Sequence, residues 1–568
     1  MESPNKTKLK KKQIKKAEWE EQYELLNEEQ KKAFDIAISG KSLMISGAAG
    51  TGKSFLLSAL IKYWNIKTPN HVVAITASTG IAATNLSRML GFGKYQGTTI
   101  HSWSGLGTSH SYKKLNEDID QITKNKSAME NWFSVHTLII EEISMISPFF
   151  FERLEEIARN FKESKKPFGG IQLIACGDWY QLEPVRKSDP PEFQEMNYCF
   201  ETKAWLETIG DNVVELFRIY RQKDIDFLVL LNEMRNGKIS LRSRELLLSR
   251  SIKLSQWMER KDDTIALYSK VSQVLDENIC QLNKLEGKEY VYEHSWIKRN
   301  INDVEKKFLI KKMLQTFSID KNPIRLKCGA KVILTVNLSV PLGLVNGLQG
   351  TIVDFGLLES DDSKDIEEKE FLPIVQFQNG MTMTVRRYIW YEHSPSILKE
   401  KPHWSSSLFK GLGYSQIPLK LGFASTIHSA QGMGFDKIGL DLGMSIFSAG
   451  QAYTGLSRCK TIEGLSLLDF HEKCIITNQK VVDFYNKYGS PQKRKEYYES
   501  IIKLRNQESP TKRKTQEPLA TEETTPTFSD SMPVSEFLKT ALSKKVKQDD
   551  LLFKTSKSDA PKVEKRPF

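Results

Sequence analysis

Short apolar runs in the first half of the chain alternate with longer segments of helical periodicity. The runs lie at residues 42–46, 72–76, 137–140 and 171–175 and are rich in β-branched residues. Such runs are typical of strands buried on both faces of a parallel sheet. A polar, acidic or glycine-containing turn follows each run. Because ligands bind at the carboxyl ends of such strands, we expect the chemistry of this protein at these turns.

The same alternation resumes later, but a stretch of β pattern interrupts it. The strands of the second unit are predicted at 264–268, 421–427, 438–442 and 465–468. The interrupting strands are predicted at 325–336, 350–355, 371–377 and 381–387. Asn379-Gly380 predicts a hairpin, because the two-residue turn it favours needs positive φ at both positions. We interpret this stretch, with its acidic loop at 359–370, as a small barrel inserted into the second unit.

Length and charge narrow the class of protein. The chain has 568 residues, enough for three or four domains, and a net charge of +12. The positive balance favours a polyanionic partner, and it also fits many ribosomal or membrane-surface proteins. The six cysteines form no CxxC pair, which argues against zinc and for a reducing compartment. No apolar run approaches the ~20 residues of a membrane helix, and no secretory signal is recognised.

Both ends of the chain differ in residue composition from the middle. Seven lysines lie between Lys6 and Lys16. After about residue 506 the composition shifts to Ser, Thr, Pro, Lys and Glu, so we predict a disordered tail that buries too little apolar surface to fold. A short helix at 534–542, with Phe537, Leu538 and Leu542, is our candidate for docking a protein partner.

A complete phosphate-loop motif follows the first apolar run. Its glycines let backbone N–H groups close around phosphate oxygens, which indicates a site for ATP. Lys53 would bring positive charge to the outer phosphates, and the Ser54 hydroxyl would bind Mg²⁺. The alternative is an ordinary glycine-rich turn. The motif consists of Gly47, Ala48, Ala49, Gly50, Thr51, Gly52, Lys53 and Ser54.

Two glutamates end the third apolar run. Glu141 would hold Mg²⁺, usually through water, and Glu142 would polarise the attacking water. The alternative is that both are ordinary surface glutamates. The phosphate loop favours the catalytic interpretation, since an ATPase of this type needs carboxylates at the end of this strand.

Three further side chains are candidates for catalysis. Gln181, after the fourth run, would lie beside the γ-phosphate and respond to its loss. Arg221 and Arg458 would neutralise charge on the γ-phosphate when the two units close. A loop glutamine and structural salt bridges are the alternatives.

Together these segments resemble the Pif-type family of superfamily 1 DNA helicases over about residues 25–475. Residues 26–30 resemble the family's adenine-reading motif, which implies nucleotide binding by Gln30. Residues 157–173 resemble a signature of this family in particular, and 343–347 resemble part of its inserted barrel. Motifs at 76–83 and 99–102 resemble its DNA contacts in the first lobe, and 427–432 resembles the motif of the second lobe that couples DNA to ATP. The DNA-binding residues that this implies are Thr79, Gly80, Thr99, His101, Ser102, His428 and Gln431.

The resemblance implies an α/β fold of two RecA-like parallel-sheet lobes with a small wedge insertion and an inserted SH3-like β-barrel. A basic arm at 1–20 precedes the first lobe, and a basic helix followed by the tail occupies 489–568. The first lobe is expected at 21–210, its wedge at about 105–132, the second lobe at 211–289 and 414–488, and the barrel at 290–413.

The resemblance also implies an activity. We expect an ATP- and Mg²⁺-dependent helicase that moves 5′-to-3′ on single-stranded DNA and unwinds duplex or G-quadruplex DNA. Its partners would be single-stranded DNA and duplex junctions, without a membrane, and the free protein would be a monomer. Replication, repair, recombination and telomere maintenance are the expected settings. The alternatives are a degenerate ATP- and DNA-binding scaffold and an ATPase that moves no nucleic acid.

Some residues depart from the family pattern. Glu141 stands where an aspartate is usual, and Ser429-Ala430 stands where the family has Lys-Ser. Basic runs at 8–16 and 510–514 resemble nuclear targeting segments, so we expect a nuclear location. A mitochondrial location is the alternative.

Overall fold

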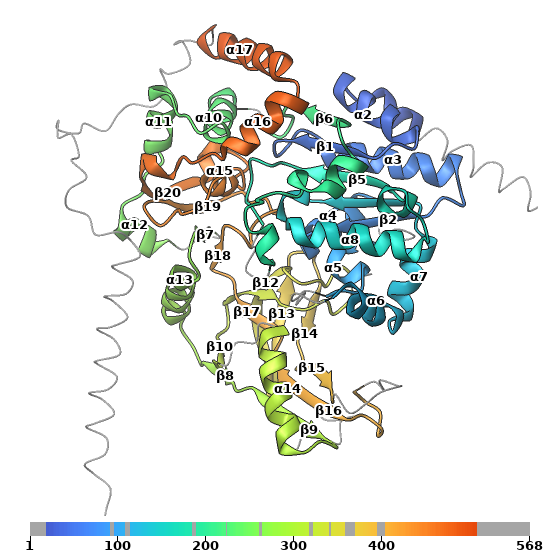
Figure 1. Cartoon of the computed structure of the whole chain (residues 1–568). Coiled ribbons are helices and arrows are strands. Elements are labelled where there is room, and N and C mark those ends of the chain that lie inside the picture. Colours follow the sequence, from blue (N-terminus) through green and yellow to red (C-terminus); the bar gives the residue numbers. More distant parts are fainter. Residues whose placement is uncertain are drawn as a thin grey trace, which may run out of the picture.

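The computed structural model describes residues 19–90, 96–107, 114–184, 189–222, 224–260, 264–316, 322–339, 342–357, 370–394 and 404–507. These residues form two parallel α/β lobes and a β-rich insertion that extends away from them (Figure 1). Most of the predicted basic arm, most of the acidic loop, and the tail with its candidate docking helix lie outside the described residues. No helix of the described part is both long and apolar enough to cross a membrane.

The first lobe is built on a six-stranded parallel sheet in the order β3-β2-β4-β5-β1-β6. Residues of its central strands are fully buried, which explains their continuous apolar sequences. The strands are β1 (Leu43–Gly47), β2 (Val73–Ala77), β3 (Thr98–Thr99), β4 (Thr137–Glu141), β5 (Gln172–Gly177) and β6 (Val213–Leu216). The four strands predicted in this lobe are confirmed to within two residues.

The predicted end of the first lobe at residue 210 is wrong. Strand β6 pairs with β1, and Glu215 lies opposite Ser46 in the register. The sheet therefore continues to Leu216. The sequence pattern missed β6 because the run is short and a glutamate interrupts it.

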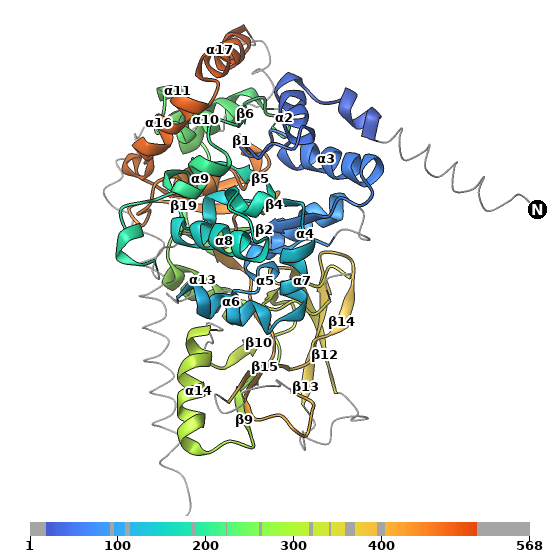
Figure 2. The same cartoon turned by 45° about the vertical axis from the view of Figure 1, so that its right-hand side comes forward.

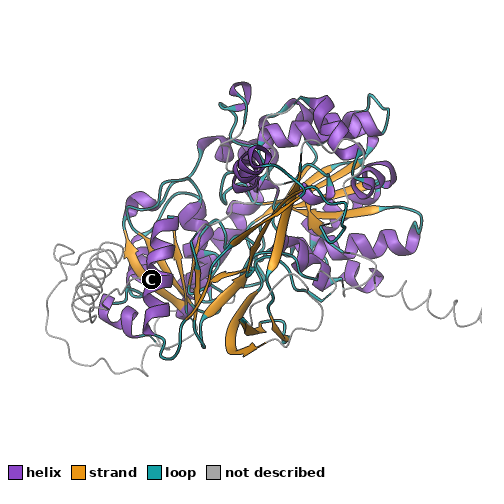
Figure 3. Cartoon of the chain, turned by 90° about the horizontal axis from the view of Figure 1, so that it is seen from below, coloured by secondary structure: helices purple, strands orange, loops and turns teal. Residues whose placement is uncertain are grey.

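Helices lie on both sides of the strands, as Figure 3 shows from below. Local signals set their starts: Asn27 and Gln30 form a capping box on α2, and Ser147 caps α8 ahead of Pro148. Helices α6 and α7 occupy the predicted wedge region. The helices of the first lobe are α2 (Glu28–Ile38), α3 (Lys53–Lys67), α4 (Gly80–Met89), α5 (Ile100–Trp103), α6 (Leu115–Thr123), α7 (Lys126–Ser134), α8 (Pro148–Phe161) and α9 (Lys203–Thr208).

The second lobe has a four-stranded parallel sheet in the order β18-β7-β19-β20. Its strands are β7 (Ile265–Tyr268), β18 (Ala424–Thr426), β19 (Ile438–Leu442) and β20 (Leu465–Phe470). Its helices are α10 (Ile225–Arg235), α11 (Leu241–Leu248), α12 (Leu254–Glu259), α13 (Val271–Lys284) and α15 (Gln451–Leu456). Two further helices, α16 (Gln479–Tyr488) and α17 (Pro491–Gln507), follow the last strand.

The insertion lies between β7 and β18 of the second lobe and forms the lower part of Figure 2. Its main sheet is antiparallel in the order β14-β13-β12-β11-β17, beside sheets β15-β16-β9 and β10-β8. Closure into an SH3-like barrel stays a prediction. Its elements are β8 (Tyr290–Tyr292), β9 (Ser295–Arg299), α14 (Asp303–Thr316), β10 (Ile324–Leu326), β11 (Lys331–Leu334), β12 (Gln349–Leu357), β13 (Phe371–Phe377), β14 (Thr382–Thr384), β15 (Tyr388–His393), β16 (Gly411–Gln416) and β17 (Leu419–Leu421).

Two details of the insertion differ from the prediction. It extends beyond residue 413, because β16 and β17 pair with insertion strands. The hairpin at Asn379-Gly380 is confirmed by the β13–β14 pairing, but only Gly380 has positive φ (87°). The Phe377 N–H donates to the Met381 carbonyl (2.7 Å), so the loop has three residues, with the glycine in the left-handed position.

Candidate nucleotide site and adjoining DNA face

The phosphate loop is held in a conformation that only glycine adopts without strain. Gly50 and Gly52 have φ of 86° and 85°, in the left-handed region. A Cβ on Gly47 would lie 2.5 Å from the Leu216 carbonyl oxygen of β6, so this loop is also tightly packed. Lys53 Nζ donates to the carbonyl oxygens of Gly47 (2.7 Å) and Ala48 (3.0 Å), and this places its charge inside the loop at the start of α3.

Ser54 and Glu141 meet as the motif predicts. The Ser54 hydroxyl donates to Oε1 of Glu141 at 2.8 Å. Burial, together with the adjacent charge of Glu142, raises the pKa of Glu141 to about 7. Neither glutamate forms a salt bridge with a residue that the structure describes. A hydroxyl beside a buried carboxylate that forms no salt bridge with a described residue is a donor set that fits a hard divalent cation such as Mg²⁺.

Glu142 occupies a strained position between the lobes. Its backbone lies in the left-handed region (φ 54°, ψ 46°), which costs a non-glycine residue about 1 kcal/mol or more. Its Oε2 accepts a hydrogen bond from Nε2 of Gln431, which belongs to the second lobe, at 3.1 Å. Backbone strain of this kind concentrates at functional sites, where it directs a side chain at its target.

Several buried polar atoms near the loop have no hydrogen-bond partner among the described residues. They include Oε1 of Gln181, both amide atoms of Gln222, Oε1 of Gln431 and Oγ1 of Thr454. Gln222 lies beside Gly50, with Oε1 only 3.2 Å from where a Cβ of that glycine would be. Buried polar groups are normally satisfied, so this set indicates a polar ligand or water between the lobes. The sequence reasoning missed Gln222, whose signal was its place next to Arg221.

The two candidate arginines approach the same cleft. Arg221 packs beside Gly50, and the Tyr220 N–H donates to the Gly50 carbonyl at 2.8 Å. The Arg221 guanidinium makes no hydrogen bond or salt bridge within the described residues. Arg458 is 3% exposed, and its guanidinium donates only to neutral oxygens, such as the carbonyls of Thr454 (3.0 Å) and Met433 (3.1 Å). Burial lowers the pKa of Arg458, and the nearby charge of Glu142 opposes that effect. A buried guanidinium that forms no salt bridge with a described residue is suited to bind an anionic ligand.

Gln30 lies under the phosphate loop. Its Oε1 accepts from the Asn27 N–H (3.0 Å), and its Nε2 donates to the carbonyl oxygens of Thr51 (3.2 Å) and Gly52 (3.5 Å). The side chain is 3% exposed. This glutamine therefore couples α2 to the loop in the structure, and adenine contact by Gln30 stays a prediction.

The residues expected to contact DNA in the first lobe cluster at two helix starts. Thr79 caps α4, and Thr99 caps α5 by accepting from the Ser102 N–H at 3.3 Å. Gly80 begins α4, and a Cβ there would lie 3.6 Å from the Asn346 carbonyl of the insertion. These ends present backbone N–H groups, which suits them to phosphate binding.

Two histidines, one from each lobe, are among the expected DNA contacts. His101 stacks on Phe150 with ring centroids 4.3 Å apart, and burial lowers its pKa to about 4. His101 is therefore neutral at pH 7 and would contact DNA without a positive charge. His428 stacks on Phe447 at 6.3 Å, and burial lowers its pKa as well.

The placement of Gln431 corrects the sequence-based prediction. We expected this residue to bind DNA, but its side chain is 1% exposed and donates to Glu142 at 3.1 Å. It also lies 3.4 Å from the Ser144 hydroxyl of the first lobe. Gln431 lies in the turn after β18. Its side chain points towards the first lobe, because its amide hydrogen-bonds there with Glu142 and Ser144.

Two parallel α/β lobes, with a phosphate loop on the first and Gln431 of the second donating to Glu142 beside that loop, define the architecture of the two-lobed P-loop proteins. The family model described as PIF1-like helicase matches residues 25–245, and a model of the DNA helicase Pif1 2B domain matches residues 312–355. The second match lies within the insertion.

Known proteins extend the match over most of the chain. The ATP-dependent DNA helicases PIF1 of Danio rerio and Homo sapiens are each 33% identical over 81% of this chain. A crystal structure of Pif1 helicase from Candida albicans is 32% identical with a TM-score of 0.66, and the match covers 81% of this chain and 98% of that one. A Bacteroides Pif1 helicase in complex with ADP-AlF3 and ssDNA is 27% identical with a TM-score of 0.61, over 82% of this chain and 97% of that one.

The chain belongs to the PIF1-like helicase family. The match spans 64% and 63% of the length of the two curated relatives from fish and human.

Proposed function

We propose that this protein is an ATP-dependent DNA helicase. The contact between Gln431 and Glu142 carries the proposal, because it joins the DNA-coupling motif of the second lobe to the carboxylate that would activate water. A change in the position of Gln431 on DNA binding would be felt directly at the hydrolysis site. The Bacteroides Pif1 helicase, which binds ADP-AlF3 and ssDNA in one complex, supports a site for each ligand.

The residues of this chain divide the chemistry among them. ATP supplies the phosphoryl group, and Ser54 and Glu141 would hold Mg²⁺, which would supply positive charge to the phosphate oxygens. Lys53 and the loop N–H groups bind the outer phosphates. Glu142 polarises the attacking water, and Gln181 responds to loss of the γ-phosphate.

The second lobe completes the charge stabilisation. Arg221 and Arg458, which form no salt bridge with a described residue, carry positive charge towards the phosphates, and this charge favours the transition state of phosphoryl transfer. Because Arg458 comes from the second lobe, hydrolysis is coupled to lobe closure. Repeated closure and opening would move the protein 5′-to-3′ along single-stranded DNA, as the family resemblance implies.

The decisive experiment combines turnover and strand separation. Steady-state ATP hydrolysis is measured with and without single-stranded DNA, and unwinding is measured on duplexes with a 5′ or a 3′ single-stranded tail. Strong DNA stimulation with unwinding of the 5′-tailed duplex alone supports the proposal. Binding without turnover would make the protein a scaffold, DNA-independent turnover would make it another kind of ATPase, and equal unwinding of both duplexes would reject the polarity.

The setting of this activity is also proposed. The basic balance of the chain suits a nucleic-acid partner, and DNA affinity should fall by about 0.7 log units per log unit of salt for each single-strand phosphate neutralised. We place the protein in the nucleus, in replication, repair, recombination and telomere maintenance, on G-quadruplexes as well as duplexes, with the mitochondrion as the alternative. Fluorescent tagging of the full chain would test the location, and sedimentation would test the monomer.

A further inference from the structure

Helix α16 crosses from the second lobe to the first. It follows β20 of the second lobe, yet its Phe484 packs on Phe200 of the first lobe with ring centroids 4.5 Å apart. Lys480 Nζ lies 2.6 Å from Oε2 of Glu201, also in the first lobe. The cost of separating α16 from the first lobe therefore includes both apolar burial and a salt bridge.

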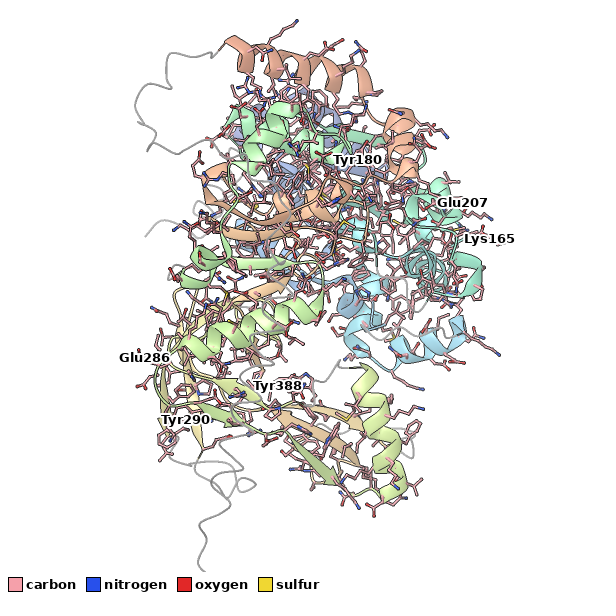
Figure 4. All side chains as sticks on the ribbon, turned by 90° about the vertical axis from the view of Figure 1, so that its left-hand side faces the viewer. Lys165, Tyr180, Glu207, Glu286, Tyr290 and Tyr388 are labelled. Atoms are coloured by element: carbon pink, nitrogen blue, oxygen red, sulfur yellow. The ribbon has the colours of Figure 1, made fainter. Side chains whose placement is uncertain are left out.

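One hydroxyl of α16 supports two loops of the candidate site. The Tyr485 hydroxyl hydrogen-bonds with the hydroxyl of Ser46, and it donates to Oδ1 of Asp178 at 3.2 Å. Ser46 directly precedes the phosphate loop, and Asp178 lies three residues before Gln181. The Tyr485 ring stacks on Tyr180 at 4.8 Å with an interplanar angle of 8°. Figure 4 labels Tyr180 in the upper body of the molecule, away from the insertion.

A buried ion pair joins the lobes at the same place. Arg235 of α10 donates to Asp178 at 2.9 Å and 3.3 Å, and the two side chains are 3% and 0% exposed. The Tyr453 hydroxyl donates to the same carboxylate at 3.2 Å. Burial alone would raise the pKa of Asp178, but Arg235 outweighs burial and holds it below its usual value. The Asp178 loop therefore depends on charge from the second lobe.

Helix α17 extends this network. Arg494 Nη1 lies 2.5 Å from Oε1 of Glu215, and the Ser490 N–H donates to Oε2 of the same glutamate at 3.0 Å. Glu215 lies opposite Ser46 in the sheet register. On its other side α17 packs on α10, with Tyr498 and Ile501 buried against residues of that helix. Tyr498 also lines a small cavity behind the phosphate loop.

From these contacts we propose that α16 and α17 form a strap (residues 478–507) that positions the phosphate loop and the Gln181 loop for ATP turnover. Tyr485 and Arg494 are its positioning residues, and neither needs to touch the nucleotide. The strap holds β1, β5 and β6 of the first lobe while α17 follows α10 of the second. The inference rests on the proposed function, and its test separates turnover from ligand binding.

The first test is Tyr485→Phe, which removes one hydroxyl and keeps the ring. Tyr488→Phe on the same helix is the matched control, because no hydrogen bond links that hydroxyl to the first lobe in the described residues. We expect kcat of DNA-stimulated hydrolysis to fall roughly tenfold in Tyr485→Phe, since small misplacements beside a reacting centre are costly. The KM for ATP and the Kd for single-stranded DNA should stay within about twofold of the original, as should all values of the control.

The second test separates positioning from stability. Arg494→Gln removes the contact with Glu215, whereas Lys495→Gln removes the same charge from a side chain whose salt bridge among the described residues lies within α17, with Glu499 at 3.9 Å. If the strap positions the phosphate loop, kcat should fall several-fold in Arg494→Gln but not in Lys495→Gln. The rates are measured well below the melting temperatures of both variants. A lower melting temperature with unchanged kcat in Tyr485→Phe and Arg494→Gln would overturn the inference. A rise in KM or Kd that matches the loss of kcat would overturn it too. Absence of any turnover in the unaltered protein would instead overturn the proposed function, and this inference with it.

Discussion

Gln431 donates from Nε2 to Oε2 of Glu142 across 3.1 Å, and this hydrogen bond joins the two lobes at the carboxylate that would activate water. Gln431 is 1% exposed, whereas Glu142 is half-buried and carries backbone strain. The hydrogen bond from Gln431 restrains the Glu142 carboxylate until the second lobe moves. We therefore expect this contact to keep turnover low in the absence of DNA, under the proposed function.

Glu142 and Glu141 should respond differently to substitution. Glu142→Gln should stop turnover while ATP still binds, because the amide keeps the shape but cannot accept a proton from water. Glu141→Asp should change the rate only modestly, because the charge is kept and a water can span the missing methylene between the carboxylate and Mg²⁺. The measurement is steady-state hydrolysis with saturating single-stranded DNA and titrated Mg²⁺. An inactive original chain that Glu141→Asp restores would identify a degenerate binder.

Lys53→Ala should abolish ATP hydrolysis and leave DNA binding nearly unchanged. The Lys53 ammonium lies within the phosphate loop, 2.7 Å from the Gly47 carbonyl, whereas the candidate DNA contacts lie at the starts of α4 and α5. Hydrolysis and fluorescence anisotropy on a labelled oligonucleotide are measured on the same preparation. Turnover near the original level would remove the phosphate-loop assignment.

Gly450→Ala should lower turnover by disturbing the contact between the lobes. Gly450 has φ of 72°, and a Cβ there would lie 2.4 Å from the Tyr180 carbonyl and 2.6 Å from that of Gln181. Gly380→Ala is a matched control, with φ of 87° and open space around it. Both variants carry left-handed strain of about 1–2 kcal/mol, but only Gly450→Ala should also reduce kcat, by about tenfold or more. Equal kcat in the two variants would contradict this expectation.

His101 should make the protein sensitive to mild acid. Burial lowers its pKa to about 4, below the unfolded value near 6.5, so its neutral form is favoured in the fold. Its contribution to stability is complete above about pH 6.5 and is lost as the pH falls towards 4, up to about 3 kcal/mol. His101→Phe keeps the stack on Phe150 and should flatten urea-unfolding stability over this range, unlike His471→Asn at an exposed site. Parallel pH profiles for His101→Phe and the original chain would refute the assignment.

The sequence pattern predicted those parts of the fold in which local sequence and burial agree. The strands of both lobes are fully or largely buried, so their apolar runs stand out, and the phosphate loop has fixed spacing. Strand β6 was missed because it contains Glu215, a charged residue in a buried strand. Glu215 accepts a hydrogen bond from Arg494, which lies 279 positions away, and no local pattern can reveal that partner. The end of the insertion was misplaced for a similar reason, since β17 is defined by its pairing with β11.

The candidate site was predicted residue by residue, but not its contacts. Motif spacing gave Lys53 and Ser54, whose roles follow from local backbone geometry. It could not give the direction of Gln431, which depends on how the second lobe docks against Glu142. Nor could it identify Tyr485, because the hydroxyl of Ser46 that it contacts lies 439 positions earlier in the chain.

The docking of α16 on the first lobe has a consequence for biosynthesis. Trp179 donates its backbone N–H to the Tyr485 hydroxyl, 306 positions later, and its ring packs against Phe484. As the chain leaves the ribosome, the first lobe has an aromatic surface that stays uncovered until the segment 306 positions later has been made. Contacts this distant in sequence slow folding and prolong exposure of apolar surface. A chain that stops before residue 478 should therefore aggregate even though both sheets are complete.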